Sequence, residues 1–372
     1  MKLTNPLFLL SMVLVLNSCT KIYQKPEAVV SLKNAYIKDF YIGTALDTSQ
    51  IDERNAMVTA LISKEFNSIT PENIMKSMFI HPEKDKFDFT MSDKYVVFGE
   101  KNNMFIHGHT LIWHSQLAPW IAQIKDSAAM SDAMTNHIST IVGKYKGRIN
   151  SWDVVNEALN EDGTLRKSVF LDSYGKDFLT LAFKLAAKAD PKTDLYYNDY
   201  NLCSAKKRKG AVDLIKNLQK NGAKIDGVGE QGHWNLNTPS LAEIEQTILD
   251  FSALGIKVAI TELDISVLPR PRDVVGADVN QISAANEKMN PYPKVLPEAI
   301  QDQLAARYEA IFKLFLKHQD KISRVTFWGV NDGQTWLNDW PIKGRSNYPL
   351  LFDREYKPKK AYFSVLDLKE KR

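Results

Sequence analysis

Two glutamates follow apolar segments of similar form. Residues 151–158 read Ser-Trp-Asp-Val-Val-Asn-Glu-Ala, so the strand-forming residues stop at Asn156 and Glu157. Residues 257–265 read Lys-Val-Ala-Ile-Thr-Glu-Leu-Asp-Ile and carry Glu262 at the matching place. Parallel α/β proteins place their chemistry at the carboxyl ends of such buried strands. We therefore expect the carboxyls of Glu157 and Glu262 to face one another across a single site.

More polar and aromatic residues follow the other strand-like segments, at residues 70–76, 107–114, 230–234 and 328–336. Burying so many polar groups costs free energy unless a ligand or a dense hydrogen-bond network satisfies them. Tryptophan rings beside amides and carboxylates suit a sugar, because a sugar ring has an apolar face and an edge of hydroxyls. The pattern therefore predicts a carbohydrate site.

The elements that must position these residues alternate along the chain. Strands are predicted at residues 41–45, 67–70, 104–112, 149–155, 194–197, 225–229, 257–263 and 323–328. Helical periodicity follows each of them, at residues 52–66, 91–101, 132–145, 177–189, 205–221, 241–254, 302–318 and 359–367. Eight such units in roughly 250–400 residues predict the α/β class and a single-domain TIM (β/α)8 barrel. The proline-rich residues 268–297 are interpreted as a long loop over the top face.

Six motifs occur in order along the chain: Thr-Pro-Glu-Asn-x-Met-Lys, His-x-Leu-x-Trp-His, Trp-Asp-Val-Val-Asn-Glu, Gly-x-x-x-Gln-x-His, Thr-Glu-Leu-Asp and Phe-Trp-Gly-Val. In this order they resemble glycoside hydrolase family 10, and the resemblance runs from about residue 32 to 368. The resemblance implies a retaining endo-β-1,4-xylanase that cleaves internal bonds of xylan or xylo-oligosaccharides through a covalent glycosyl-enzyme intermediate. It implies no cofactor and no metal.

The resemblance also implies roles for individual residues. Glu157 matches the acid/base and Glu262 the nucleophile, while Asn156 matches the residue that binds the sugar 2-hydroxyl. Asp264 would orient His233, which would hold Glu262. The matched substrate contacts are Glu72, Asn73, Lys76, His109, Trp113 and Gln116 on the non-reducing side, together with Gln231, Trp328 and Trp336. Trp120, Tyr200 and Trp340 receive no role.

Two other functions fit parts of the sequence. A metal-dependent hydrolase on the same barrel would use His107, His109, His233 and Asp332 as ligands, but it would leave both glutamates without a role. A catalytically inactive xylan-binding lipoprotein would have lost one catalytic carboxyl, and both are present. Residues 227–232 also fit the dinucleotide fingerprint Gly-x-Gly-x-x-Gly. We reject that fingerprint because no helix is predicted directly after it.

The first residues are of a different kind. Lys2 precedes an apolar run at residues 7–16, which is too short to span a bilayer, so residues 1–18 are predicted to be an export signal. The ending Leu-Asn-Ser-Cys at residues 16–19 resembles a bacterial lipoprotein signal, which implies lipidation of Cys19 and a tether over residues 19–31. The protein is then expected to be anchored in the bacterial cell envelope, periplasmic or on the cell surface. An ordinary cleaved signal is the alternative.

The composition excludes several classes of protein. Of 372 residues, 44% are hydrophobic and the net charge is only +4, so a large core is expected and nucleic-acid binding is not. The basic run at residues 206–209 is expected to be a solvated helix face. Cys203, the only cysteine besides Cys19, is expected to be a buried thiol. We expect a monomer.

Overall fold

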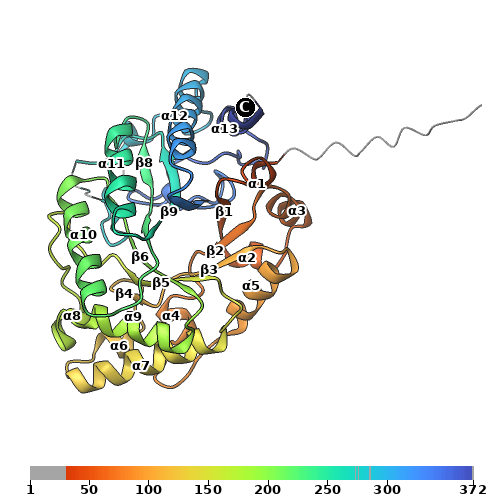
Figure 1. Cartoon of the computed structure of the whole chain (residues 1–372). Helices are drawn as coiled ribbons and strands as arrows, with labels where there is room; N and C mark the ends of the chain where they lie inside the picture. The colour runs from red at the N-terminus through yellow and green to blue at the C-terminus, as the bar shows by residue number, and fades with distance from the viewer. Residues whose placement is uncertain (1–30, 273, 275, 285, 371–372) are drawn as a thin grey trace, which may run out of the picture. The chain divides into compact units, whose positions relative to one another are not determined.

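Eight parallel strands form a closed barrel in this computed structural model, which describes residues 31–272, 274, 276–284 and 286–370. The strands, in barrel order, are β1 (Tyr41–Leu46), β2 (Ser68–Pro71), β3 (Phe105–Gly108), β5 (Ser151–Asn156), β6 (Asp194–Asp199), β7 (Gly227–Glu230), β9 (Lys257–Ser266) and β10 (Ile322–Phe327). Strand β10 pairs with both β9 and β1, which closes the barrel (Figure 1). The predicted TIM barrel is confirmed.

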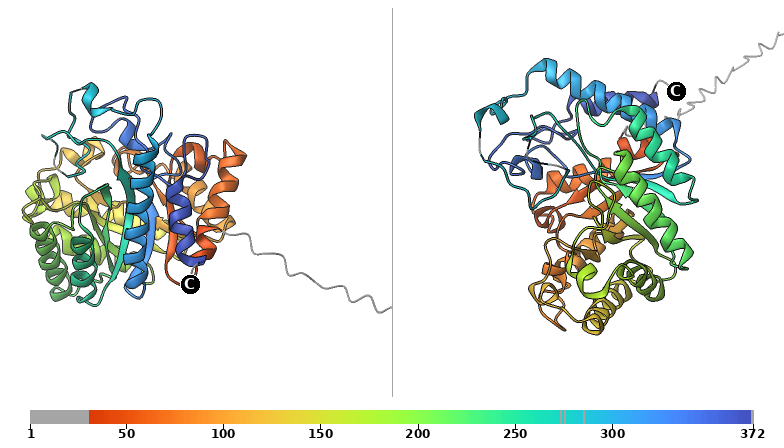
Figure 2. Two further views of the ribbon diagram at one scale, coloured as in Figure 1. Left: turned by 90° about the horizontal axis from the view of Figure 1, so that it is seen from above. Right: turned by 90° about the vertical axis from the view of Figure 1, so that its left-hand side faces the viewer.

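Helices surround the strands, as the views in Figures 1 and 2 show. They are α1 (Leu32–Ala35), α2 (Thr48–Ile51), α3 (Ala56–Glu65), α4 (Ser77–Ile80), α5 (Thr90–Lys101), α6 (Pro119–Ala122), α7 (Ser127–Lys144), α8 (Val169–Tyr174), α9 (Phe178–Ala189), α10 (Ala205–Lys220), α11 (Leu241–Ser252), α12 (Glu298–Lys317) and α13 (Lys360–Glu370), with the 3-10 helices η1 (Glu287–Met289) and η2 (Trp336–Asn338). Among the described residues, no helix has both the length and the apolar character needed to cross a membrane.

Local sequence accounts for the ends of these elements. Helix α11 begins at a capping box, in which the Ser240 hydroxyl and the Glu243 carboxylate satisfy each other's backbone N–H groups. The chain then turns at Gly255, whose φ of 75° favours glycine. Residues 227–232 run from β7 into β8 (His233–Asn235), and the next helix begins only at Leu241. The dinucleotide fingerprint was therefore rejected correctly.

The segment predicted as one strand over residues 104–112 is two strands in the structure. Strand β3 ends at Gly108, which pairs with Trp152, and the short β4 (Ile112–Trp113) pairs with Val155 and Asn156. The chain advances four residues from Gly108 to Ile112, whereas β5 advances only three from Trp152 to Val155. The extra residue therefore bulges out of the ladder of paired strands. His109 lies in this bulge, at the carboxyl ends of the strands.

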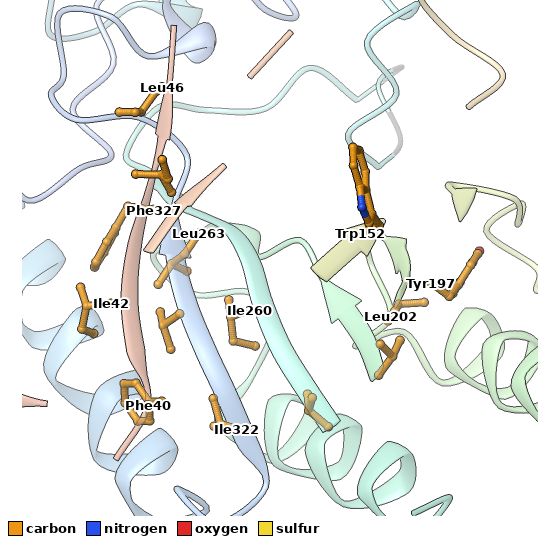
Figure 3. Close-up of a cluster of buried hydrophobic side chains, with 14 of the residues drawn as sticks. Phe40, Ile42, Leu46, Trp152, Tyr197, Leu202, Ile260, Leu263, Ile322 and Phe327 are labelled. Atoms are coloured by element: carbon orange, nitrogen blue, oxygen red, sulfur yellow. The ribbon is translucent and has the colours of Figure 1, made fainter. Parts of the chain in front are cut away.

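Large apolar side chains fill the space between the strands and the helices. Figure 3 shows Ile42, Ile260, Ile322 and Phe327 among them, all almost completely buried. Removing such side chains from water stabilises the fold by roughly 1.5–3 kcal/mol each. This packing keeps the strand ends, which carry the site, in fixed positions.

The prediction of a solvated basic face at residues 206–209 is wrong for two of its residues. Lys207 is 0% exposed, with its Nζ 2.9 Å from Asp199 Oδ1, and Arg208 Nε lies 2.7 Å from Asp250 Oδ2. Both face inward because acids on neighbouring elements offer them partners, which helical spacing alone does not reveal. Cys203 is buried with a free thiol, as predicted.

Residues 1–30 lie outside the described residues. The expected signal peptide and Cys19 fall there, as does the expected tether except for Ser31. Ser31 is buried and directly precedes α1.

Candidate active site

One cavity opens at the carboxyl ends of the strands, and both expected catalytic glutamates line it. Glu157 comes directly after β5, and Glu262 lies within β9, across the barrel. The cavity is lined by Lys76, His109, Trp113, Asn156, Glu157, Gln231, His233, Glu262, Ala277, Val279, Trp328 and Trp336. The structure therefore brings together most of the residues singled out in the sequence. Asp264, Glu72, Asn73 and Gln116 lie outside the lining.

Glu157 is held by neutral groups. Its carboxyl accepts hydrogen bonds from the indole N–H of Trp113 and the side-chain amide of Gln231, both at 2.9 Å. Its own N–H donates to the carbonyl of Asn198 at 2.8 Å, and its φ of 57° is uncommon for a residue with a side chain. Backbone strain of this kind clusters at functional sites.

The pKa of Glu157 is raised above the ordinary value of 4.5. Burial is the main cause, because it disfavours the charged form, and the nearby charge of Glu262 acts in the same direction. The hydrogen bonds from Gln231 and Trp113 offset only part of this. Glu157 is therefore suited to carry a proton.

Glu262 has a different set of partners. One carboxylate oxygen accepts a hydrogen bond from Asn198 Nδ2 at 2.8 Å, and the other lies 3.2 Å from His233 Nε2. Burial by itself raises the pKa of Glu262, but His233 and His109 outweigh it and bring the pKa below its ordinary value. Glu262 is therefore suited to be ionised beside a protonated Glu157.

His233 is held between two carboxylates. Its Nδ1 lies 3.1 Å from Asp264 Oδ1, because β8 pairs with β9 so that His233 is opposite Asp264. Burial lowers the pKa of His233, but Asp264 and Glu262 outweigh burial and raise the pKa to about 10. The other oxygen of Asp264 accepts a hydrogen bond from Trp336 Nε1 at 2.8 Å. His233 is therefore a cation at neutral pH.

Asn198 is a site residue that sequence reasoning missed. Its side-chain amide donates to Asn156 Oδ1 at 2.9 Å and to Glu262 Oε1 at 2.8 Å, while its carbonyl oxygen accepts from Thr261 Oγ1 at 2.6 Å. A chain of hydrogen bonds thus joins Asn156 to Glu262. The available signal was the sequence Asn-Asp at residues 198–199, where β6 ends on polar residues as β5 does.

Lys76 is the centre of a second polar group in the cleft. Its Nζ donates to Asn73 Oδ1 at 2.9 Å and to Gln116 Oε1 at 2.7 Å, and it lies 4.7 Å from the centre of the Trp113 ring. Burial lowers the pKa of Lys76 to about 8 and raises that of the neighbouring Glu72. Asn73 and Gln116 therefore support a cation that lines the cavity.

Tryptophans form one wall of the cleft. Trp336 stacks on Trp340 with ring centres 4.5 Å apart, and Trp328 lies 5.6 Å from His109. Trp340, left without a role in the sequence, therefore supports this wall. Trp120 donates its indole N–H to the carbonyl of His81 and is not among the residues that line the cavity.

The long loop between β9 and α12 also contributes to the cavity, through Ala277 and Val279. Between them, Asp278 pairs with Arg166 at 3.2 Å. Arg166 also donates to the hydroxyl of Tyr200, another residue left without a role in the sequence. The loop therefore covers the site, as expected, but its lining residues had no signal because Ala and Val carry no chemistry.

Comparison with known proteins assigns the family. Residues 31–368 match the model of glycosyl hydrolase family 10. The chain belongs to this family. It is 41% identical over 362 residues to endo-1,4-beta-xylanase A of Xylanibacter ruminicola, covering 95% of this chain and 98% of the relative.

Solved structures agree with the family 10 assignment. A GH10 endoxylanase retrieved from a sugarcane soil metagenome is 47% identical, with a TM-score of 0.88 over 91% of this chain and 100% of the other. A mutant structure in complex with xylotriose is 34% identical, with a TM-score of 0.80 over 91% of this chain and 99% of the other.

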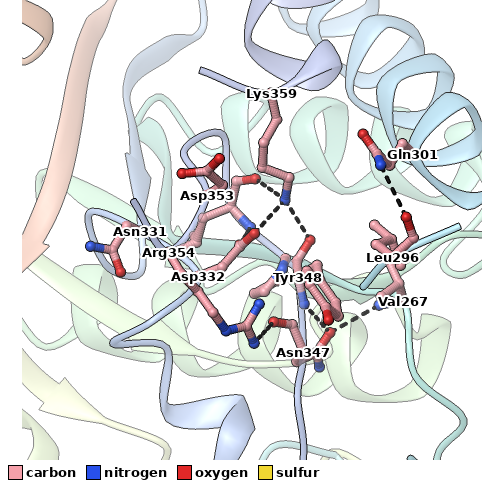
Figure 4. Close-up of polar contacts among 12 residues, drawn as sticks. Val267, Leu296, Gln301, Asn331, Asp332, Asn347, Tyr348, Asp353, Arg354 and Lys359 are labelled. Atoms are coloured by element: carbon pink, nitrogen blue, oxygen red, sulfur yellow. Dashed lines mark hydrogen bonds and ion pairs between the residues drawn. The ribbon is translucent and has the colours of Figure 1, made fainter. Parts of the chain in front are cut away.

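Two of the four residues of the alternative metal site, His107 and Asp332, are engaged with other side chains in this family 10 chain. His107 Nε2 lies 2.9 Å from Asp153, and the Arg324 guanidinium, a cation, lies 3.1 Å from the same nitrogen. Asp332 pairs with Lys359 at 2.7 Å (Figure 4). Among the described residues, no group of three or more His, Cys, Asp or Glu side chains is arranged to hold a metal ion. The metal-dependent alternative therefore has no site in this part of the chain.

Proposed function

We propose that the chain is an endo-β-1,4-xylanase that cleaves internal xylosidic bonds with retention of anomeric configuration. The observation that carries the proposal is the pair of buried carboxyls in one cavity, whose pKa values are shifted in opposite directions. An acid and an ionised nucleophile side by side are what a retaining glycosidase needs. The similar proteins support xylan or xylo-oligosaccharides as the substrate, because they are named xylanases or hold xylotriose.

In the first step a carboxylate oxygen of Glu262 attacks the anomeric carbon. The new carbon–oxygen bond forms as the glycosidic bond breaks, and Glu157 gives its proton to the leaving oxygen. In retaining enzymes the two carboxyls stand about 5–5.5 Å apart, which leaves room for the sugar carbon but not for a water molecule between them. The product is a glycosyl ester on Glu262 and a released chain end.

In the second step water hydrolyses this ester. Esterified Glu262 has no charge, so it no longer raises the pKa of Glu157, and Glu157 becomes a base. Glu157 takes a proton from water while the water oxygen attacks the anomeric carbon, and Glu262 leaves as a carboxylate. Two displacements at one carbon restore its original configuration.

Other residues hold the substrate and the nucleophile. Asn156 binds the 2-hydroxyl, a contact that strengthens in the transition state. The Asp264–His233 pair keeps Glu262 oriented and ionised. Substrate contacts come from Glu72, Asn73, Lys76, His109, Trp113, Gln116, Gln231, Trp328 and Trp336, with the tryptophan wall crowding the extra hydroxymethyl group of a hexose.

Linear xylohexaose and linear xylan test the proposal. The β-anomer of the new reducing end should appear first in the proton NMR spectrum, before mutarotation. The viscosity of the polymer should fall while few reducing ends have formed, which indicates internal cleavage. Initial release of the α-anomer, or release of xylose from chain ends only, would contradict it.

We also propose that Cys19 carries a lipid anchor that holds the enzyme in the cell envelope, with residues 20–30 as a tether. The short apolar run and the Leu-Asn-Ser-Cys ending support this. The full chain, expressed in a bacterium fed labelled palmitate, should take up the label and sediment with membranes. Cys19→Ser should abolish both, whereas Cys203→Ser is the matched control. Label that persists in Cys19→Ser would refute the anchor.

A further inference from the structure

Among the residues that the structure describes, Arg270, beside the catalytic cavity, has no hydrogen-bond or ion-pair partner. Arg270 follows β9, in the loop that covers the site, and its side chain is partly buried. Within the described part of the chain its guanidinium makes no hydrogen bond or ion pair with another residue, and its Nε is fully buried. The guanidinium lies 5.7 Å from the centre of the Trp340 ring. A half-buried cation without an anion is costly unless a ligand supplies the anion.

Two described acids that act electrostatically on Arg270 are already engaged with other groups. Glu161 and Asp264 both act electrostatically on it. Glu161, however, pairs with Lys207 at 3.2 Å. Asp264 lies 3.1 Å from the His233 cation and accepts the Trp336 indole N–H. Neither acid pairs directly with Arg270, and Arg345 and His233 add positive charge along the same surface.

Arg270 lines two hollows that adjoin the catalytic cavity. One lies toward Trp340 and Arg345, and the other lies toward Asn201 and Thr238. Both are bordered by His233, which also lines the catalytic cavity. The polar groups in their walls include the side chains of Asn201, Ser204, Asn235, Thr238 and Ser266. Amides and hydroxyls beside an indole ring suit a sugar, as in the main cleft.

We propose that Arg270 binds the carboxylate of a uronic-acid side group carried by the xylan chain under cleavage. The inference rests on the proposed function and identifies the substrate class more closely. A planar guanidinium matches a carboxylate with two parallel hydrogen bonds, which a neutral substituent cannot accept with the same strength. The hollows share His233 with the catalytic cavity. A uronic-acid side group on a sugar bound in the cavity can therefore place its carboxylate at Arg270.

A series of contacts connects Arg270 to the catalytic residues. Arg270 lies over Trp340, Trp340 stacks on Trp336, and Trp336 donates to Asp264, which orients His233. A side group bound at Arg270 is thus held at a fixed distance from the nucleophile. The position of the uronic acid relative to the cleaved bond should therefore be the same in every product.

The test compares glucuronoxylan with the same polymer after its uronic carboxyls have been reduced to alcohols. The wild-type enzyme should show the higher kcat/KM on the acidic polymer. In Arg270→Gln the ratio of the two kcat/KM values should fall about tenfold, the size expected for one charge-assisted contact that is partly exposed to water. Arg272→Gln is the matched control, because Arg272 is an exposed arginine of the same loop, and it should keep the wild-type ratio.

Equal wild-type activity on the two polymers, or an unchanged ratio in Arg270→Gln, would overturn the proposal. The wild-type comparison needs no substitution, so the proposal stays testable even if Arg270→Gln does not fold. Linear xylohexaose, assayed in parallel, separates the two hypotheses. No cleavage of xylohexaose means that the proposed function is wrong, whereas cleavage without a preference for the acidic polymer removes only the role of Arg270.

Discussion

Glu157 and Glu262 are the same residue type in one cavity, 4% and 5% exposed, and their surroundings differ in charge. The groups that donate to Glu157 are neutral, so burial dominates and its pKa rises. Glu262 lies against the cationic His233, which overcomes the same burial. The charge of the donor, rather than the depth of burial, therefore decides which carboxyl keeps a proton.

The backbone positions of the two glutamates also differ. Glu262 lies inside β9, whose neighbouring residues pair with β7 on one side and β10 on the other. Glu157 lies one residue beyond β5, with a positive φ. The nucleophile is thus fixed within the sheet, whereas the acid stands at its edge. Substitutions at the two glutamates and at their hydrogen-bond partners should separate the role of the nucleophile from that of the acid.

Glu262→Ala should reduce kcat on xylan at least about 10⁴-fold, because the other carboxyl described in the cavity, Glu157, serves as the acid and does not replace the nucleophile. Added azide should enter the vacated space and restore turnover of an aryl β-xylobioside, giving an α-glycosyl azide. The product is identified by NMR. A β-glycosyl azide as the sole product would mean that Glu262 is not the nucleophile.

Glu157→Ala should cost about 10²–10⁴-fold on xylan, the usual contribution of a positioned general acid. On aryl xylobiosides with good leaving groups the first step should be nearly unaffected, since such leaving groups need no proton. The fall of kcat/KM at high pH should also disappear, because it reports the ionisation of Glu157. The rates of the two substrate types are compared in one buffer series, and an equal loss on both would argue against the acid role.

His233→Gln should move the low-pH limb of kcat/KM upward and lower the maximum less than either glutamate variant does. The wild-type limb reports ionisation of Glu262, whose pKa lies below the ordinary 4.5 mainly because of His233, with a contribution from His109. Without that cation, burial raises the pKa of Glu262, so a higher pH is needed to ionise it. Trp336→Phe, which loses one hydrogen bond to Asp264 but keeps His233, is the control. An unmoved limb would leave His233 with a structural role only.

The sequence was sufficient for the barrel and for most of the cavity, because strand ends can be recognised along the chain. Contacts between side chains on different helices and strands could not be predicted. Lys207 was expected in solvent, yet it pairs with Asp199, which precedes it by eight positions in the same β/α unit. Ala277 and Val279 carry no chemical signal and line the cavity only because of the path of their loop. Arg270 has no distinguishing signal in the sequence, because only the three-dimensional structure shows that it lacks a hydrogen-bond or ion-pair partner among the described residues.

Asn198 contacts both glutamates, because its carbonyl accepts the N–H of Glu157 and its side chain donates to Glu262. Its removal should have the smallest effect on activity. Asn198→Ala deletes the donor shared by Asn156 Oδ1 and Glu262 Oε1, so kcat/KM on xylan should fall about tenfold, as expected for one lost hydrogen bond to a charged group. Because the charge of His233 remains, the low-pH limb should move less than in His233→Gln.

Asn198→Asp sharpens the same test, since it replaces a donor with a third carboxyl. Thr261→Val is the matched control, because it removes only the hydroxyl that donates to Asn198 Oδ1 at 2.6 Å and leaves the amide donors in place. The aspartate variant should lose more activity than the alanine variant and show a higher low-pH limb, because like charges raise the pKa of Glu262. If both Asn198 variants kept the wild-type pH profile while their thermal unfolding midpoints fell, Asn198 would support the barrel rather than the charge of the nucleophile.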